Sequence, residues 1–484
     1  MAKQHHLTVE KIGGTSMSRY DSVRDNIIRR SGRSKPPYHR ILVVSAYAGI
    51  TDRLLEHKKS GQPGIYALFA NGRQDDSWQD ALRQLDIEMQ QINAELFADD
   101  STLCDAANAF MSNRLTRARH CLEDLENLCR HGHFSLADHL ATVREMLASL
   151  GESHSAWNMA ERLKNDGINA RFVDLTGWQD DAEQNLDERI KSAFDDIDLA
   201  NELPITTGYA HTQEGLMSTF DRGYSEMTFS RIAVMFEADE AIIHKEFHLS
   251  SADPRVVGTD KAVPIGRTNY DVADQLANLG MEAIHPKAAK GLRQHDIPLR
   301  IKNTFEPEHT GTLITRDYVS EKPCAEIIAG TQGLYALEVY DQNMSGNHIH
   351  YDLEILKQLA RFNIPVIAKD TNANTITHYI SASLKIIKRV RRALEEHFDE
   401  AIIDQQQVAM VCAIGSDLRV PGILAKTTQC LANHQIQIKA VHQSPREVDI
   451  QFIIHQNDYH KATQSLHQCL VEIHDHGRAI CLAS

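Results

Sequence analysis

A lysine, two glycines and two hydroxyl residues lie together near the start of the chain, in the stretch VEKIGGTSMSRYDSVRDNII that begins at Val9. Glycines lack side chains and therefore let backbone N–H groups converge on an anion. The preceding Lys11 could place its positive charge on phosphate oxygens during phosphoryl transfer. The same residues also suit an ordinary tight turn with a surface lysine, and this stretch alone does not separate the two interpretations.

Two further stretches carry residues suited to holding an amino acid. In VVSAYAGITDRLL, an expected strand ends in small residues around Ser45 and Thr51, which would let a ligand approach the backbone. In LASLGESHSAW, the carboxylate of Glu152 could bind an ammonium group. The simpler interpretations are a strand–loop–helix joint, with Thr51 or Asp52 capping the helix, and a solvated glutamate.

Two later stretches could contact anions. In STFDRGYSEMTF, Arg222 could hold a carboxylate by two parallel hydrogen bonds, and Glu226 would lie in the first turn of a helix capped by Ser225. In HKEFHLSSADPRVVG, Arg255 could reach phosphates from a loop that follows a strand. The simpler interpretations are a capped helix with a surface arginine, and a surface turn.

Several well-known motifs are missing from the sequence. It has no GxxxxGK[ST] loop, no GxGxxG after an expected strand and no HRD–DFG pair. Its eight cysteines form no CxxC pair and no HExxH occurs, so we predict no metal site. The formal net charge is −15 without a basic stripe, which argues against nucleic acid as a partner.

The N-terminal residues contain no apolar leader, and no run of about eighteen apolar residues occurs. Scattered thiols suit a reducing compartment. These features predict a cytoplasmic protein that has no membrane partner.

Alternating strand and helix patterns must position the residues that could do chemistry. LTVEKIGG, SVRDNIIRR and RILVVSAYAG predict strand, helix and strand, the βαβ order of a parallel sheet covered by helices. A long polar sequence with a helical pattern, over about residues 56–150, predicts a helical insertion. Prolines, glycines and charges in FEPEHTGTLITRDYVSEKPC predict a domain boundary.

The last third of the chain has a different pattern. From about Gln407 onward its elements follow the order βαββαβ, the ferredoxin-like plan, with AICLAS as a candidate closing strand. A similar order precedes it, so we predict two such units in series, at residues 325–398 and 406–484.

Together and in this order, the stretches resemble the aspartate kinases of the amino-acid kinase superfamily. KIGGTSM is similar to that family's K-[FI]-G-G-[TS]-S opening, and SAYAGITDRL, SLGES, STFDRGYSEMT, SSADPRVV, IHPKA and IPLRIKNTFEPEHTGTLI are similar to its later blocks. The resemblance covers the whole chain. It implies an α/β protein with a three-layer αβα kinase domain of mainly parallel sheet at residues 1–316, followed by two ferredoxin-like ACT domains.

The resemblance also implies ATP-dependent phosphorylation of the β-carboxylate of L-aspartate, with Mg²⁺ bridging the nucleotide phosphates. Lys11 would stabilise the transferring phosphoryl group, and Glu226 would orient Lys11. Glu152 would bind the substrate's α-ammonium and Arg222 its α-carboxylate, beside Ser45, Thr51 and Ser225. The nucleotide would be held by Gly13, Gly14, Ser16, His244, Lys245, Ser250, Arg255 and Lys287. An amino-acid effector, lysine or threonine, would act at the ACT domains of a homodimer or larger oligomer.

Three positions depart from the family pattern. Glu226 replaces an aspartate, His244-Lys245 replaces a Thr-Asp pair, and Glu282 replaces a lysine. We hypothesise that Lys245 and Glu282 form a swapped ion pair across the nucleotide site. With these departures the chain resembles the aspartate kinases associated with ectoine biosynthesis in salt-tolerant bacteria.

Two other functions remain open at this point. One is a kinase for glutamate, N-acetylglutamate or carbamate, and the other is a regulatory protein with a decayed kinase domain. The loop and helix in VAMVCAIGSDLRVPGILAKTTQCLANHQI could likewise hold an amino-acid effector or form a purely structural dimer interface.

Overall fold

The computed structural model divides by contacts into two units. The first unit comprises residues 1–248 and 284–316, and the second comprises residues 249–283 and 317–484. The side chain of Thr219 is not described. The structure describes residues 6–29, 37–57, 60–71, 76–131, 133–178, 180, 183–220, 223–281, 283–472 and 479–480.

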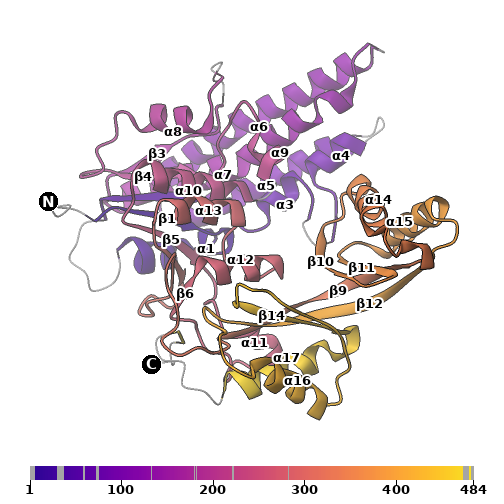
Figure 1. The fold of residues 1–484 in the computed structure, drawn as a ribbon. Coiled ribbons are helices and arrows are strands. Elements are labelled where there is room, and N and C mark those ends of the chain that lie inside the picture. The colour runs from indigo at the N-terminus through magenta and orange to yellow at the C-terminus, as the bar shows by residue number, and fades with distance from the viewer. Residues whose placement is uncertain are drawn as a thin grey trace. The chain divides into compact units, whose positions relative to one another are not determined.

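A mainly parallel sheet forms the centre of the first unit, as the sequence predicts (Figure 1). Within this unit its strands lie in the order β3-β4-β2-β1-β5-β7-β8; among the pairs described, β7–β8 is antiparallel and the others are parallel. Their bounds are Thr8–Ile12 (β1), Arg40–Val44 (β2), Ala170–Val173 (β3), Leu203–Thr207 (β4), Glu240–Lys245 (β5), Leu299–Asn303 (β7) and Thr312–Thr315 (β8).

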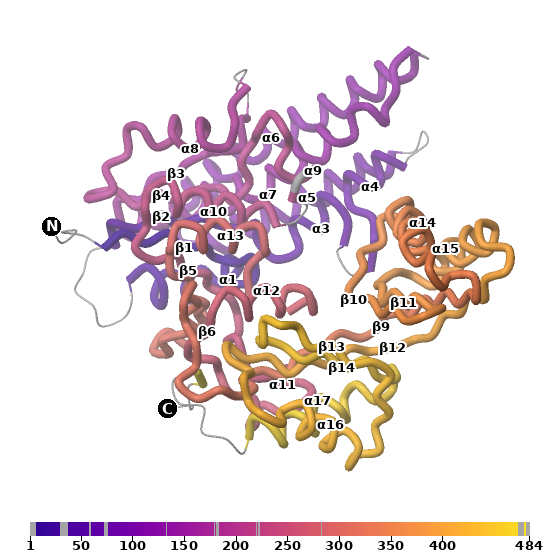
Figure 2. Tube along the Cα trace, viewed as in Figure 1, coloured from indigo at the N-terminus to yellow at the C-terminus, as the bar shows by residue number. Residues whose placement is uncertain are grey.

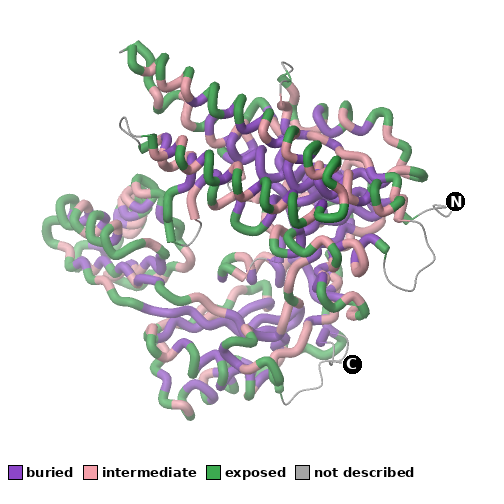
Figure 3. Tube along the Cα trace, turned by 180° about the vertical axis from the view of Figure 1, so that it is seen from behind, coloured by how far each residue is buried: buried purple, intermediate pink, exposed green. Residues whose placement is uncertain are grey.

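Helices cover both faces of this sheet. A π-helical turn at Val23–Ile28 and helix α7 (Leu140–Asn165) pack on one face, and α10 (Tyr224–Met235) contacts β1, β2 and β5 from the other, with α8 (Leu186–Phe194) and α13 (Pro286–Gln294) beside it. Side chains alternate along a strand, so neighbouring residues of β1 face different helices. Figure 3 shows buried residues gathered in the interior of the first unit and exposed residues along its outer helices.

The described residues between 56 and 150 are mainly helical, as expected, and form α4 (Ile65–Asn71), the long α5 (Ser77–Leu96) and α6 (Ser101–Cys129), and the start of α7. Helices α5 and α6 pack side by side (Figure 1). The remaining short helices of the first unit are α1 (Gly14–Met17), α2 (Tyr20–Ser22), α3 (Ile50–Leu54), a 3-10 turn (Leu136–Asp138) and α9 (Leu216–Phe220).

The second unit contains an antiparallel sheet of order β10-β11-β9-β12-β14-β13. The two central strands, β9 (Ile327–Tyr340) and β12 (Ile402–Ile414), pair along almost their whole length (Figure 2). The others are β10 (Val366–Thr371), β11 (Thr375–Ile380), β13 (Ile438–Gln443) and β14 (Asp449–His455).

Two ferredoxin-like halves share these central strands. One half follows the order β9-α14-β10-β11-α15-β12, with α14 at His348–Arg361 and α15 at Leu384–His397. The other continues as β12-α16-β13-β14-α17, with α16 at Ile423–Asn433 and α17 at Tyr459–Leu470, and its fourth strand is the first part of β9. The expected closing strand AICLAS contributes only a bridge from Ile480 to Ile265, and residues 481–484 lie outside the described residues.

The segment 249–283 also belongs to the second unit. It holds α11 (Pro254–Val257), the short strand β6 (Arg267–Asn269) and α12 (Tyr270–Asn278), and short 3-10 turns occur elsewhere in the unit at Gln342–Met344 and Gln456–Asp458. Residues of this segment share an apolar core with α16 and α17. No helix in the described part of the chain is long and apolar enough to cross a membrane.

Candidate active site

Lys11 lies on β1 and faces helix α10. Its Nζ atom is 3.4 Å from Oε1 of Glu226, which lies in the first turn of α10, where the sequence places it. Both side chains are largely buried, because the lysine projects from the centre of the sheet. A strand and a helix more than 200 residues apart therefore meet in one charged pair.

The second oxygen of Glu226 is also held. Oε2 accepts a hydrogen bond from the backbone N–H of His285, 2.5 Å away. The His285 ring lies so close to Gly223 that a Cβ there would come within 2.5 Å of it. Burial alone would raise the pKa of Glu226, but the charges of Lys11 and Lys245 and the His285 N–H hold that pKa below its usual value. Glu226 is therefore an ionised group between two lysines.

Glu152 on α7 and Ser225 on α10 form a contact between two helices at this site. The Ser225 hydroxyl donates a 2.6 Å hydrogen bond to Oε1 of Glu152, which is fully buried on α7. Oε2 of Glu152 has no hydrogen-bond partner among the described residues, and a Cβ at Gly208 would lie 2.9 Å from it. Burial raises the pKa of Glu152 to about 8, although Ser225, the charge of Lys11 and the nearby backbone N–H of Tyr209 favour the ionised form.

Ser225 differs in one respect from the expectation that it caps α10. The helix begins at Tyr224 after Gly223, which makes no side-chain capping bond, and the Ser225 hydroxyl is used on Glu152 instead. The expected caps of α3 differ in the same way, because the helix starts at Ile50 behind Gly49 (φ +84°) and places Thr51 and Asp52 inside its first turn.

The glycine turn after β1 is close-packed. A Cβ at Gly14 would lie 2.6 Å from the carbonyl oxygen of Ala46, so only glycine fits against the end of β2. Gly13 donates its N–H to the carbonyl of His244, 3.2 Å away. The first N–H groups of helix α1 have no acceptor within the helix. The Ser16 hydroxyl is instead hydrogen-bonded to Thr304 Oγ1 at 2.8 Å.

Ser45 follows β2 directly. Its N–H donates to the carbonyl of Ile12 at 3.1 Å, and its own carbonyl accepts from the Ser155 hydroxyl at 2.9 Å. These bonds fix the end of β2 against β1 and α7. The small residues that the sequence marks around Ser45 thus lie where β1, β2 and α7 meet, and α7 is the helix that carries Glu152.

The opposite face of β1 holds a different charged cluster. Glu10 is fully buried, pairs with Arg40 at 2.7 Å through both carboxylate oxygens, and lies 2.8 Å from Nε2 of His244. Arg40 also donates to the carbonyls of Ile27 and Ile28. Burial alone would raise the pKa of Glu10, but Arg40 and His244 hold it well below its usual value. Burial lowers the pKa of His244, against the pull of Glu10.

Adjacent residues of β5 therefore face different sides of the sheet. His244, which the resemblance places in the nucleotide site, uses its imidazole on Glu10, and Lys245 is near enough to Glu226 to lower its pKa. Only one of the two side chains can face Lys11, because successive strand residues alternate. A role for the His244 imidazole in binding nucleotide would require breaking its bond to Glu10.

The other predicted residues are distributed over both units. Lys287, at the start of α13, lies with its Nζ 4.9 Å from the centre of the Phe220 ring. Ser250 and Arg255 belong to the second unit, where Arg255 pairs with Asp253 at 2.8 Å and is largely exposed. Arg222 and Glu282 lie outside the described residues, so the proposed Lys245–Glu282 pair remains a hypothesis.

Sequence reasoning missed several residues of this site. Gly208 lies against Glu152, and His285 donates a hydrogen bond to Glu226. The Glu10–Arg40–His244 cluster supports the strand that carries Lys11. A carboxylate in a buried strand, as at Glu10, is a usable signal, since a buried charge needs a partner. The described residues contain no cluster of three or more His, Cys, Asp or Glu side chains suited to a metal ion.

Comparison with known proteins gives this geometry a context. The model of the amino acid kinase family matches residues 6–303, and an ACT domain model matches residues 411–470. Aspartate kinase Ask_Ect of Stutzerimonas stutzeri is 55% identical over 478 residues, which cover 98% of this chain and 100% of that protein.

Solved structures show the same fold. The crystal structure of E. coli aspartokinase III in complex with aspartate and ADP (R-state) matches with a TM-score of 0.70 and 20% identity, covering 96% of this chain and 100% of that one. The complex of the same protein with lysine and aspartate (T-state) matches equally, at 19% identity. Because the 55% identity extends over nearly the whole length of both proteins, the chain belongs to the aspartate kinase family.

Proposed function

We propose that this chain transfers the γ-phosphoryl group of ATP to the β-carboxylate of L-aspartate and releases 4-phospho-L-aspartate and ADP. The observation that carries the proposal is the 55% identity to Aspartate kinase Ask_Ect over 98% of the chain. The geometry around Lys11, Glu226, Glu152 and Ser225 supports it, because it offers one positive and one negative anchor next to each other.

Glu152 is the proposed partner of the aspartate α-ammonium group. Among the described residues, Oε2 of Glu152 has no hydrogen-bond partner; a buried carboxylate oxygen left in this way is costly, and a substrate ammonium group would satisfy it. Ser225 would hold the other oxygen of Glu152 in place, and Ser45 and Thr51 would line the pocket beside it. Arg222 would bind the α-carboxylate, a role that rests on the resemblance alone.

Lys11 and the glycine turn supply what phosphoryl transfer needs. The reaction forms a bond from a β-carboxylate oxygen of aspartate to the γ-phosphorus and breaks the bond from that phosphorus to the bridging oxygen, which leaves with ADP. Its catalysis rests on positioning and on positive charge, and no protein nucleophile takes part. Glu226 would hold the ammonium of Lys11 at the γ-phosphoryl group.

The nucleotide residues of the proposal are those that the resemblance implies, Gly13, Gly14, Ser16, Lys245, Lys287, Ser250 and Arg255. We place His244 among the residues that support β5, because its imidazole is bonded to Glu10. Mg²⁺, which would neutralise charge on the phosphates, would be bound mainly by the nucleotide.

A hydroxamate assay with ATP, Mg²⁺ and L-aspartate tests the proposal. Parallel reactions would contain L-glutamate or N-acetylglutamate, and a Lys11→Ala variant would serve as the inactive control. We expect product from aspartate alone and none from the variant. Product from another acid only would change the substrate and keep the reaction, and no product from any acid while ADP still binds would favour a decayed regulatory protein.

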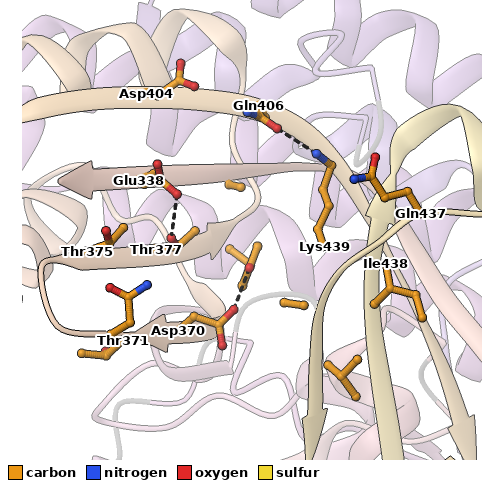
Figure 4. Close-up of a pocket in the computed structure, with 15 residues that line it drawn as sticks. Glu338, Asp370, Thr371, Thr375, Thr377, Asp404, Gln406, Gln437, Ile438 and Lys439 are labelled. Carbon is orange, nitrogen blue, oxygen red and sulfur yellow. Dashed lines mark hydrogen bonds between the residues drawn. The ribbon is translucent and has the colours of Figure 1, made fainter. Parts of the chain in front are cut away.

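An amino-acid effector is part of the same proposal. A cavity of about 670 Å³ opens on the sheet face of the second unit, lined by β9, β10, β11, β12 and β13 (Figure 4). Glu338, Asp370 and Asp404 place three carboxylates around it, against the single ammonium of Lys439. This charge balance suits lysine, with its second ammonium group, better than threonine.

The loop between β12 and α16, where the sequence suggests an effector, is filled by the chain itself. Cys324 donates its N–H to the carbonyl of Asp417 at 3.0 Å, and a Cβ at Gly415 would meet the Cys324 carbonyl at 2.2 Å. The Ser416 hydroxyl donates to the buried Glu326. We therefore place the effector on the sheet face rather than in this loop.

Titration of lysine and threonine into the protein would test this placement. Lysine should bind and inhibit, and Glu338→Gln with Asp404→Asn should weaken its binding about tenfold or more, while Ser416→Ala should change it little. Equal binding by the wild type and the double variant would remove the effector from the sheet face. Sedimentation in the same buffers would measure the oligomeric state, for which we propose a homodimer.

The pathway is a separate part of the proposal. The resemblance to ectoine-associated aspartate kinases suggests that the product feeds ectoine synthesis. Deletion of the gene in its host should lower ectoine at high salt and leave growth without added lysine, threonine and methionine intact. A requirement for those amino acids would assign the enzyme to their synthesis instead.

A further inference from the structure

The loop that carries Ser250 and Arg255 belongs to the second unit and is hydrogen-bonded to other elements of that unit. The carbonyl of Ser251 accepts a 2.8 Å hydrogen bond from the N–H of Ile328 on β9. At the other end of the loop, the N–H of Gly266 donates to the carbonyl of Ala479 at 3.0 Å. Two of the proposed nucleotide residues therefore take their position from the second unit.

His467 makes the central contact between helix α17 and this loop. The imidazole is fully buried, with Nε2 2.9 Å from Oγ of Ser251 and Nδ1 3.0 Å from Oε1 of Glu472. Oγ of Ser251 also accepts a 3.1 Å hydrogen bond from the N–H of Val263. All these bonds are satisfied when Nδ1 carries the proton and donates to Glu472, so that Nε2 accepts from the Ser251 hydroxyl.

Serine, histidine and glutamate in this order also resemble the nucleophile, base and orienting acid of a hydrolase. Ser251 is fully buried, however, and its oxygen already accepts the Val263 N–H. A nucleophile must reach a carbonyl carbon, and this hydroxyl has no exposed surface from which to do so. The contact therefore holds the loop and does not perform hydrolysis.

A second contact lies three residues earlier on α17. The side-chain Nε2 of Gln464 donates to the carbonyl of Val256 at 2.7 Å. Residues three apart share a face of a helix, so α17 holds the loop at two points, Ser251 and Val256. Each of these points directly follows one of the proposed nucleotide residues, Ser250 and Arg255.

We propose that His467, assisted by Gln464, is a positioning residue for the nucleotide. Helix α17 fixes the loop at residues 249–258 in the conformation that binds ATP, so the affinity for nucleotide depends on the packing of an ACT helix. The proposal rests on the proposed function, in which Ser250 and Arg255 contact ATP. Neither His467 nor Gln464 touches the reacting atoms.

Variants of both contacts test the proposal in the full-length protein. Gln464→Ala removes the exposed contact, His467→Ala removes the buried one, and His467→Gln keeps a polar side chain of similar reach. Gln468→Ala is the matched control, because Gln468 is exposed on the same helix. Three quantities are measured: hydrogen exchange of the peptide covering residues 249–265, the dissociation constant of ADP, and the KM values for ATP and aspartate.

We expect Gln464→Ala and His467→Ala to accelerate exchange in that peptide and to raise the ADP dissociation constant and the ATP KM about three- to tenfold. The aspartate KM should stay within twofold, His467→Gln should recover part of the loss, and Gln468→Ala should match the wild type.

Faster exchange with unchanged ADP affinity would overturn the proposal, because α17 would then hold the loop without serving the nucleotide. Unchanged exchange in the Gln464→Ala protein would also overturn it, even if the buried His467→Ala variant failed to fold. A wild-type protein that binds no ADP would overturn the proposed function and this inference with it, whereas normal wild-type binding that the variants leave unaffected would overturn the inference alone.

Discussion

Glu10 and Lys11 are neighbours on one buried strand, yet their surroundings differ in a way that separates structure from function. Both oxygens of Glu10 are bonded, to Arg40 and to His244, and the arginine's remaining donors reach the carbonyls of Ile27 and Ile28. Within the described part of the chain, Lys11 forms one ion pair, with Oε1 of Glu226 at the longer distance of 3.4 Å. Near it, Glu152 keeps one buried oxygen without a partner among the described residues.

The difference shows what each face of the sheet is built for. A buried charge network that is satisfied within the chain holds elements together, here β1, β2, β5 and the π-helical turn. A buried charge that is only partly satisfied costs stability until a ligand completes it. The predictions below test whether the two faces can be separated by substitution, in order of decreasing effect.

Removing the charge of Lys11 should have the largest effect, on catalysis alone. Lys11→Met should lower kcat at least about a thousandfold, because one preorganised positive charge at a transferring phosphoryl group contributes that much. The thermal midpoint should stay close to that of the wild type, since methionine fills the same space. Lys164→Met, which changes an exposed lysine, is the control. A variant that keeps a tenth of the wild-type kcat would remove Lys11 from the reaction.

Removing Arg40 should lower stability and leave catalysis nearly unchanged. Arg40→Met should lower the free energy of unfolding by about 3–5 kcal/mol, because it leaves the buried charge of Glu10 without its main partner. Urea titration would measure the loss, and the folded fraction should retain nearly normal kcat. Adding Glu10→Gln to Arg40→Met should recover part of the stability. Arg392→Met, in an exposed pair with Glu396, should change little.

A stable Arg40→Met protein with a large loss of kcat would contradict this comparison, since it would make the Glu10 face part of the catalytic machinery.

Glu152→Gln should raise the aspartate KM about ten- to a hundredfold and abolish a pH dependence. In the free enzyme the pKa of Glu152 is raised to about 8 by burial. Binding the α-ammonium group requires the ionised form, so kcat/KM for aspartate should rise with pH through about 8 in the wild type. The variant should show no such rise, and its ATP KM should be unchanged.

The raised pKa of Glu152 also predicts how the stability of the fold depends on pH. Glu152 binds a proton more tightly in the folded chain than in the unfolded one, so its contribution favours folding at low pH. That contribution is lost as the pH rises from about 4.5 toward 8. Glu152→Gln should therefore flatten the fall in stability over this range.

A wild-type kcat/KM that does not change between pH 7 and 9 would mean that Glu152 is already ionised, or does not meet the ammonium group.

The sequence predicts much of this site because its chemistry is local. Strand, turn and helix each fall within a few residues of Lys11, Glu152 and Glu226, so short patterns locate them. The Glu10–His244 contact could not be predicted, because it joins residues 234 positions apart and depends on the register of β1 against β5. Strand alternation alone, however, would have shown that His244 and Lys245 face opposite sides.

The second unit shows a different limit. Each ferredoxin-like half has the expected local order, and both ACT-like patterns are legible in the sequence. The fourth strand of the later half is nevertheless the first part of β9, which precedes the other half in the chain. Local patterns give element types and cannot tell which of two equally suitable strands closes a sheet. The loop at 249–265 is a similar case, since its contacts, such as that of Ser251 with His467 on α17, place it in this unit and its sequence does not.

The smallest effect should come from shortening Glu226 by one methylene. Its two oxygens bridge Lys11 and the backbone N–H of His285, and an aspartate at this position cannot span both. Glu226→Asp should therefore lower kcat about three- to tenfold, with unchanged stability, while Glu226→Gln keeps the length, loses the charge and should lower kcat further. Steady-state rates of the two variants beside the wild type decide the matter. A Glu226→Asp variant as active as the wild type would show that the contact with Lys11 does not depend on the hydrogen bond from His285. Lys11 would then be held more loosely than its distance to Glu226 indicates.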